Sequence, residues 1–197
     1  MMPDEPLLLD LTPRPIRADA QKNHELLLRT AAALFSARGV EAVTMSDIAQ
    51  AAGVGKGTLY RHFSHKTEVC HALLDYEQRQ LQARTLARLR TNQPPLDDVH
   101  WFAEQVADFV MQNLAYLSVV DAAVPLMMEH PAHRWWWQTL RALMERSGVA
   151  GDLDYLTDAL VLLLDPVTLR FQAEARGYSQ QRIVDGLHTV IRRLTLA

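Results

Sequence analysis

The chain has 197 residues, 49% of them hydrophobic, and a formal net charge of −3. This length suffices for one large domain or two smaller ones with a sizeable core, and the charge excludes a uniformly basic protein that coats nucleic acid. No apolar run reaches the roughly 18 to 20 residues that span a bilayer, and the first residues lack a signal-peptide pattern, so we expect a cytoplasmic protein without membrane contact.

The chain begins with a proline-rich arm and a long helix. Residues 1–16 contain four prolines and no sustained apolar period, which indicates a mobile arm. Apolar side chains recur on one helical face over residues 18–38, and Gly39 stands where a left-handed C-cap belongs. Residues 17–66 contain seven basic and four acidic side chains, which gives this segment a net charge of +3. The rest of the chain therefore has a net charge of −6. A locally basic segment of this kind suits a localised contact with DNA phosphates.

Two short helices joined by a glycine-containing turn follow. Thr44 can cap the first, over about 45–52, because its hydroxyl can accept a hydrogen bond from a free first-turn amide while Asp47 reaches back to the cap. Gly53 breaks this helix, and another short helix is predicted over about 56–62. This spacing is the helix-turn-helix pattern.

The rest of the chain is also predicted to be helical. We expect a helix over 65–90, a fifth capped by Asp97 or Asp98 with Leu117 turned inward, and a short one through Met127 and Met128. Further helices are expected over 131–146, over 155–176 with a kink or break at Asp165–Pro166, and over 180–196. No strand pattern stands out. The predicted fold class is therefore all-α, with about nine helices.

The stretch TMSDIAQAAGVGKGTLYRHFSHKTEV, with AAALFSARG before it, resembles the TetR-family signature, in which T, IA, AGV, GTLY, HF and K recur at these spacings. The resemblance, at about residues 26–70, implies a one-component, homodimeric transcriptional repressor. It implies a three-helix DNA-binding domain at 17–66 and a larger helical domain for ligand binding and dimerisation at 67–197. Gly55 departs from the pattern, where the family most often has Ser or Thr, but glycine is an adequate N-cap.

We predict that eight residues of the helix-turn-helix contact double-stranded operator DNA. Thr44 and Lys66 lie at helix starts and are assigned to phosphates. Lys56 and Thr58 lie on the third helix and are assigned to base edges, and the family pattern implies that Tyr60 contacts phosphate or thymine. The other candidates are Gly57, Arg61 and His62, whereas Leu59 and Phe63 are assigned to the core.

Three adjacent tryptophans are the most unusual feature of the C-terminal part. Successive helix residues turn by about 100 degrees, so three adjacent indoles cannot all point into one core. Trp136 continues an inward stripe with Leu140 and Leu143, so Trp135 and Trp137 must line flanking surfaces. Because the resemblance implies a central cavity, we predict a deformable site for a hydrophobic or aromatic effector. Its predicted lining is Phe102, Phe109, Met127, Met128, Trp135, Trp136, Trp137 and Met144, and plain packing is the alternative for each.

The resemblance also implies that the last two helices pair with their copies in a second subunit. Both carry wide apolar stripes, which supports this independently. The predicted interface consists of Leu160, Leu163, Val167, Phe171, Ile183, Leu187, Val190, Ile191 and Leu194. The alternative is that these stripes close the core of a single subunit.

Other kinds of site and function are less well supported by the sequence. His130 and His133 with Glu129 form the only metal-like cluster, but Pro131 lies between the histidines and the sequence places no further ligand, so we expect no metal or cofactor. The single Cys70 is expected to be a small buried residue rather than a redox sensor. The sequence does not place a general base beside a nucleophile, which speaks against an enzyme. An effector-independent activator or a structural DNA-binding factor remains an alternative to the repressor.

Overall fold

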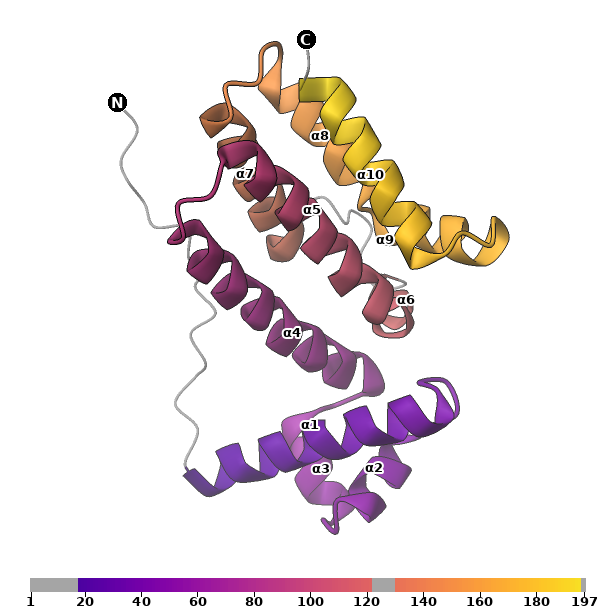
Figure 1. Cartoon of the computed structure of the whole chain (residues 1–197). Helices are drawn as coiled ribbons and strands as arrows, with labels where there is room; N and C mark the ends of the chain where they lie inside the picture. Colours follow the sequence, from indigo (N-terminus) through magenta and orange to yellow (C-terminus); the bar gives the residue numbers. More distant parts are fainter. Residues whose placement is uncertain (1–17, 122–129, 196–197) are drawn as a thin grey trace. The chain divides into compact units, whose positions relative to one another are not determined.

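The structure is a computed structural model, and it describes residues 18–121 and 130–195 (Figure 1). Within these ranges the regular secondary structure is helical, without strands, as the sequence predicts. The predicted short helix through Met127 and Met128 lies outside the described residues. None of the helices in the described ranges is both long and apolar enough to cross a membrane.

The described residues divide into two compact units. The N-terminal unit comprises residues 18–76 and 115–121, and the C-terminal unit comprises residues 77–114 and 130–195. The sequence placed the boundary at 66/67, whereas the packing of the chain extends the first unit to Tyr76 and adds the segment that follows Leu114.

The N-terminal unit is built on a helix-turn-helix. It contains α1 (Ala18–Arg38), α2 (Met45–Ala51), α3 (Lys56–His62), the start of α4 (Lys66–Leu89), and nearly all of α6 (Leu114–Asp121). Its fully buried apolar side chains include Leu27, Ala31, Val43, Ile48 and Leu59. They come from α1, α2, α3 and the loop before α2, so burial of their apolar surface holds the two short helices against α1.

The C-terminal unit is a packed array of longer helices. It contains the end of α4, α5 (Pro95–Gln112), α7 (Pro131–Arg146), α8 (Leu153–Leu163), α9 (Pro166–Arg170), the π-helical turn η2 (Phe171–Ala175) and α10 (Gln180–Thr195). α7 packs against both α5 and α8, and α10 runs beside α5 (Figure 1). The side chains of Phe102, Val106, Trp136, Leu140 and Leu143 fill the space between α5 and α7, where each is at most 2% exposed.

The fifth helix differs from its prediction at both ends. It begins at Pro95, since proline suits the first helical position, and neither Asp97 nor Asp98 caps it. Asp98 is buried instead and accepts a 2.9 Å hydrogen bond from Arg88 Nε. The helix also ends at Gln112 instead of continuing past Leu117. The side-chain amide of Asn113 donates to the Phe109 carbonyl (2.8 Å), and a separate helix, α6, follows.

The predicted break at Asp165–Pro166 is confirmed. α8 ends at Leu163, and the Asp165 carboxylate accepts hydrogen bonds from the amides of Val167 (2.8 Å) and Thr168 (3.3 Å), so it caps α9. Beyond Arg170 the helix widens into the π-helical turn η2. The region expected to be helical over 155–176 therefore consists of three consecutive segments, α8, α9 and η2.

Candidate DNA-binding surface and effector site

The recognition helix α3 is fixed by its apolar side and exposed on the other. Leu59 and Phe63, at 0% and 3% exposure, lie in the core as predicted. The turn before α3 passes through Gly53, whose φ of +68° is a left-handed conformation that favours glycine. With its apolar face anchored, α3 leaves Lys56, Gly57, Tyr60 and Arg61 exposed.

Several of the predicted DNA contacts on α3 also interact within the chain. Arg61 folds back along its helix, where Nε donates to the Gly57 carbonyl (3.2 Å) and Nη2 donates to the Thr58 hydroxyl (3.2 Å). His62 is half-buried, with its ring 5.8 Å from that of His24 on α1. The side chains most open to a DNA base are therefore those of Lys56 and Tyr60, and all the DNA contacts stay predictions.

Thr44 and Asp47 form the capping box that the sequence predicts at the start of α2. The Thr44 hydroxyl accepts a 3.1 Å bond from the Asp47 amide, while the Asp47 carboxylate accepts 2.8 Å bonds from both the amide and the hydroxyl of Thr44. These bonds stabilise the charged carboxylate, so they hold the pKa of Asp47 below its usual value, with a smaller contribution from Arg38.

The lowered pKa of Asp47 predicts an acid-dependent loss of stability in the N-terminal unit. A depressed pKa contributes stability that is fully present above the unfolded-state value, near 3.8, and is lost as the pH falls through the folded-state value. We expect Asp47→Asn to remove this part of the pH dependence. Urea titrations between pH 2 and pH 6 would measure it, and an unchanged pH profile in the variant would show that the box does not carry the effect.

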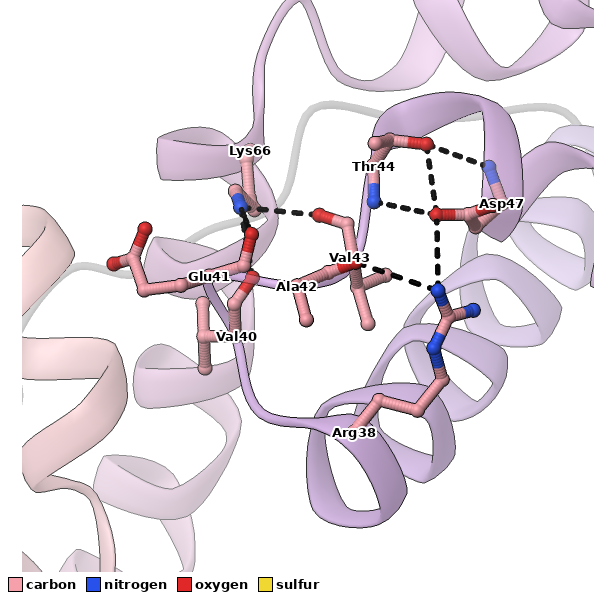
Figure 2. A network of polar contacts seen from close by, with 8 residues as sticks. All are labelled: Arg38, Val40, Glu41, Ala42, Val43, Thr44, Asp47 and Lys66. Carbon is pink, nitrogen blue, oxygen red and sulfur yellow. Dashed lines mark hydrogen bonds and ion pairs between the residues drawn. The ribbon is translucent and has the colours of Figure 1, made fainter.

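Lys66, which the sequence assigns to a phosphate, contacts backbone carbonyls of its own chain. Its Nζ donates to the carbonyls of Val40 (2.7 Å), Val43 (3.0 Å) and Glu41 (3.3 Å), so all three ammonium hydrogens have acceptors in the loop between α1 and α2 (Figure 2). This geometry favours a positioning role for Lys66 over the direct phosphate contact predicted from its place at a helix start.

Arg38 holds the same loop from its other side and was not singled out in the sequence. Its Nη2 lies 3.4 Å from the Ala42 carbonyl and 3.7 Å from an Asp47 carboxylate oxygen (Figure 2). Arg38 and Lys66 thus hold the backbone directly before Thr44. We expect both contacts to support the backbone conformation of Thr44, whose contact with a phosphate stays a prediction.

Most of the predicted effector residues lie in the interior of the C-terminal unit. Trp136 is 1% exposed and packs edge-on to Phe109, with ring centroids 5.6 Å apart, and Trp135 packs edge-on to Phe102 at 5.4 Å. Met144 is also fully buried. Trp136 therefore points inward with Leu140 and Leu143 as predicted, and Trp135 packs against α5.

Trp137 points elsewhere. Its indole Nε1 donates a 2.7 Å hydrogen bond to the carboxylate of Asp158 on α8, on the exposed side of the α7/α8 pair. This hydrogen bond favours a role for Trp137 as a link between two neighbouring helices, and its assignment to the effector site stays a prediction. Met127 and Met128, the remaining two members of the predicted site, lie outside the described residues.

The predicted dimer-interface residues fall into three groups by their burial within one subunit. Leu160, Ile183, Leu187 and Ile191 are at most 5% exposed within one subunit, because α10 packs against α5 and α8. For these four, the burial favours the alternative that the stripes close the core of a subunit, and their assignment to the interface stays a prediction. Val167 and Phe171 are 56% and 52% exposed, and Leu162 on α8 is 57% exposed. The others, Leu163, Val190 and Leu194, are half-buried.

Cys70 is fully buried on α4, as expected from the sequence. Burial disfavours the thiolate and raises the pKa of the thiol to about 11. The thiol is therefore uncharged and unreactive at neutral pH.

A capped helix-turn-helix followed by a larger helical unit defines a class of DNA-binding regulatory proteins. Comparison with known families identifies the class more narrowly, since residues 27–73 match the family described as bacterial regulatory proteins, tetR family. The match to this family is confined to these residues, about a quarter of the chain. The match covers α2, α3 and parts of α1 and α4, which hold the capping box and the recognition helix.

Individual relatives agree with this assignment. A protein described as an HTH-type transcriptional regulator, from Staphylococcus aureus strain MRSA252, is 32% identical over 111 residues, which cover 55% of this chain and 58% of that relative. The chain thus spans little more than half the length of this curated relative.

Solved structures show the fold over nearly the whole chain. A TetR-family transcriptional regulator from Pectobacterium atrosepticum has a TM-score of 0.73 at 20% identity and covers 93% of this chain and 99% of its own. A regulator from Saccharomonospora viridis, solved in complex with choline, has a TM-score of 0.71 at 21% identity and covers 87% and 96%.

Proposed function

We propose that this chain is a homodimeric repressor that binds a palindromic operator and releases it when a small hydrophobic or aromatic effector binds the C-terminal unit. The observation that carries the proposal is the anchored recognition helix. Its apolar side chains are buried and its Lys56 and Tyr60 side chains are exposed, as a helix that enters the major groove requires.

The tetR-family relationship supports a regulator, and the geometry of the capping box supports a phosphate contact beside it. The capping box fixes the start of α2, where the helix dipole and the free first-turn amides attract an anion. Phosphate contacts of this kind set the orientation of the protein on DNA, whereas side chains of α3 read the bases.

The link between effector and DNA runs through α4, which starts in the N-terminal unit and continues into the C-terminal one. In our proposal, effector binding shifts α4 and thereby changes the separation of the two recognition helices in the dimer. An effector can do this only if it binds the two states with different affinity, and the DNA must then weaken effector binding by the same factor.

We expect Lys56→Ala to weaken operator binding by about 1 to 3 kcal/mol for each base that the lysine recognises and to relax the base preference at one position of each half-site. An operator can be selected from a random duplex pool. Fluorescence anisotropy would then compare the operator, its single-base variants and unrelated DNA at several salt concentrations.

Arg79→Ala is the matched control, since Arg79 is an exposed basic residue of α4 in the C-terminal unit. It should leave operator affinity and base preference unchanged. If Lys56→Ala lowers the affinity for every duplex equally, Lys56 is a phosphate contact, and if the wild-type chain prefers no sequence, the proposed repressor is wrong.

A further inference from the structure

Five buried side-chain nitrogens in the described part of the C-terminal unit have no hydrogen-bond partner, and three of them lie on α4 and α7. These three are Nε2 of Gln78, Nε2 of Gln82 and Nε2 of His133. Gln78 and His133 are only 4% and 6% exposed, and Gln82 lies one turn after Gln78 on α4. Buried polar groups are nearly always paired in folded proteins, so several unpaired ones in one interior point to a bound polar group.

The orientation of the Gln78 amide follows from chemistry. The indole Nε1 of Trp136 can only donate, and it donates to Gln78 Oε1 at 3.1 Å. The oxygen of the amide must therefore face Trp136, and the NH2 group cannot exchange places with it. The two hydrogens on Gln78 Nε2 face away from this bond and require an acceptor.

The same indole also lies against apolar surface and against His133. The His133 ring is 4.5 Å from that of Trp136, and Phe109 contacts Trp136 edge-on. A molecule that accepts a hydrogen bond from Gln78 would therefore lie beside an aromatic wall. This combination of a few polar groups with apolar walls is typical of small-molecule sites.

The charges around the indole favour an uncharged ligand. Burial lowers the pKa of His133 to about 4, so the imidazole is neutral at physiological pH and supplies no positive charge for an anion. The carboxylate of Asp165 acts on His133 in the opposite direction, but it is already bonded to two amides of α9. An anionic ligand beside His133 would be repelled by this carboxylate and would gain no positive charge from the neutral imidazole.

We propose that the effector is an uncharged molecule with an apolar body that packs on Trp136 and a carbonyl-type acceptor that receives a hydrogen bond from the Gln78 amide. His133 Nε2 offers a second polar contact beside the first. The inference rests on the proposed function, since it names the chemical class of the effector. It also limits the hydrophobic or aromatic effector expected from the sequence to molecules that carry such an acceptor.

Four matched probes test the inference on the full chain. They are 4-phenyl-2-butanone, which carries a carbonyl; butylbenzene, which carries none; 3-phenylpropionate, an anion; and trimethyl(2-phenylethyl)ammonium, a cation. Isothermal titration calorimetry would measure the binding of each. We expect the ketone to bind at least about tenfold more tightly than each of the others, because only it satisfies the buried donors without introducing a charge.

Two variants locate the contact. Gln78→Met keeps the length of the side chain but removes the amide, so it should lower the affinity for the ketone to that for butylbenzene and change the latter by less than about twofold. Gln80→Met is the matched control, because Gln80 is an exposed glutamine on the same helix. It should leave both affinities unchanged. If Gln78→Met does not fold, the comparison of the four probes on the wild-type chain decides.

Equal affinity for ketone and hydrocarbon, tighter binding of either ion, or no binding of any probe would overturn the inference. Operator affinity is measured separately, with and without the ketone. A chain that binds operator but no ketone refutes this inference and leaves the DNA-binding proposal intact. A chain that binds the ketone without any loss of operator affinity supports this inference and refutes release by an effector.

Discussion

Replacing Lys66 by methionine is expected to lower the free energy of unfolding by about 2 to 4 kcal/mol and to weaken operator binding about tenfold or more. The ammonium donates to three carbonyls of the loop between α1 and α2, and two of these bonds are partly buried. Methionine fills the same space but leaves those carbonyls unpaired. The loop that positions Thr44 would then lose its support from this side.

The salt dependence of binding separates this positioning role from a phosphate contact. If Lys66 contacted a phosphate, as its place at a helix start suggested, its removal would reduce the slope of log affinity against log salt by about 0.9 for each phosphate that it neutralises. A positioning residue should lower the affinity and leave the slope unchanged. Anisotropy titrations from low to high salt, with urea unfolding of the same samples, measure both quantities.

Lys66→Arg provides the decisive companion variant. It keeps the positive charge, so it would restore affinity at a phosphate contact, but the planar guanidinium fork cannot reproduce three bonds from one nitrogen to three carbonyls. We expect Lys66→Arg to bind operator weakly, close to Lys66→Met. Full affinity in Lys66→Arg, together with a reduced slope in Lys66→Met, would return Lys66 to the phosphate-contacting group.

The sequence predicts well those helix caps and breaks that depend only on residues close together in the chain. The Thr44 capping box, the Gly39 C-cap and the break at Pro166 each depend on residues within four positions of one another. Gly39, for example, has a φ of +80° and its amide donates to the Phe35 carbonyl at 2.9 Å. Backbone geometry and local hydrogen bonds suffice for such predictions.

The features that sequence missed depend on partners far along the chain. Lys66 bonds to carbonyls 23 to 26 residues before it, and Asp98 is paired with Arg88 instead of capping its own helix. The role of Gln78 depends on Trp136, 58 residues away. A polar residue on a predicted helix gives no sign of these partners, because solvent exposure is the default for such residues.

Apolar stripes raise a related problem. Their periodicity shows that one face of a helix is covered, but not whether helices of the same subunit or of a second subunit cover it. Leu187 and Ile191 lie on such a stripe and are covered by the subunit's own helices, at 5% and 0% exposure. Val167 and Phe171 are more than half exposed in one subunit. Only the distribution of burial separates a core face from a face that is open to a second subunit.

The difference in burial between these two pairs of residues leads to the prediction with the largest expected effect on DNA binding. The double variant Val167→Glu with Phe171→Glu should yield a folded monomer whose operator affinity is at least about 100-fold lower, because one subunit can occupy only one half-site. In an isolated subunit the two glutamates remain in water at little cost. In a dimer interface they would be buried without partners, which is strongly unfavourable.

Leu86→Glu is the matched control, since Leu86 is also an exposed apolar residue, at 43%, but lies on α4 instead of α8 to α10. It should leave the dimer intact. Leu187→Ala should behave in a third way, with a loss of about 2 to 5 kcal/mol in the free energy of unfolding, because it opens a cavity in the subunit core.

Sedimentation equilibrium, circular dichroism and operator titrations distinguish these outcomes. A double variant that stays dimeric with wild-type operator affinity would place the interface on a different surface of the C-terminal unit. A double variant that unfolds as readily as Leu187→Ala would show that Val167 and Phe171 support the subunit itself. Only a folded monomer with weak operator binding agrees with an interface at α9 and η2, since it requires that these side chains serve the dimer and not the core.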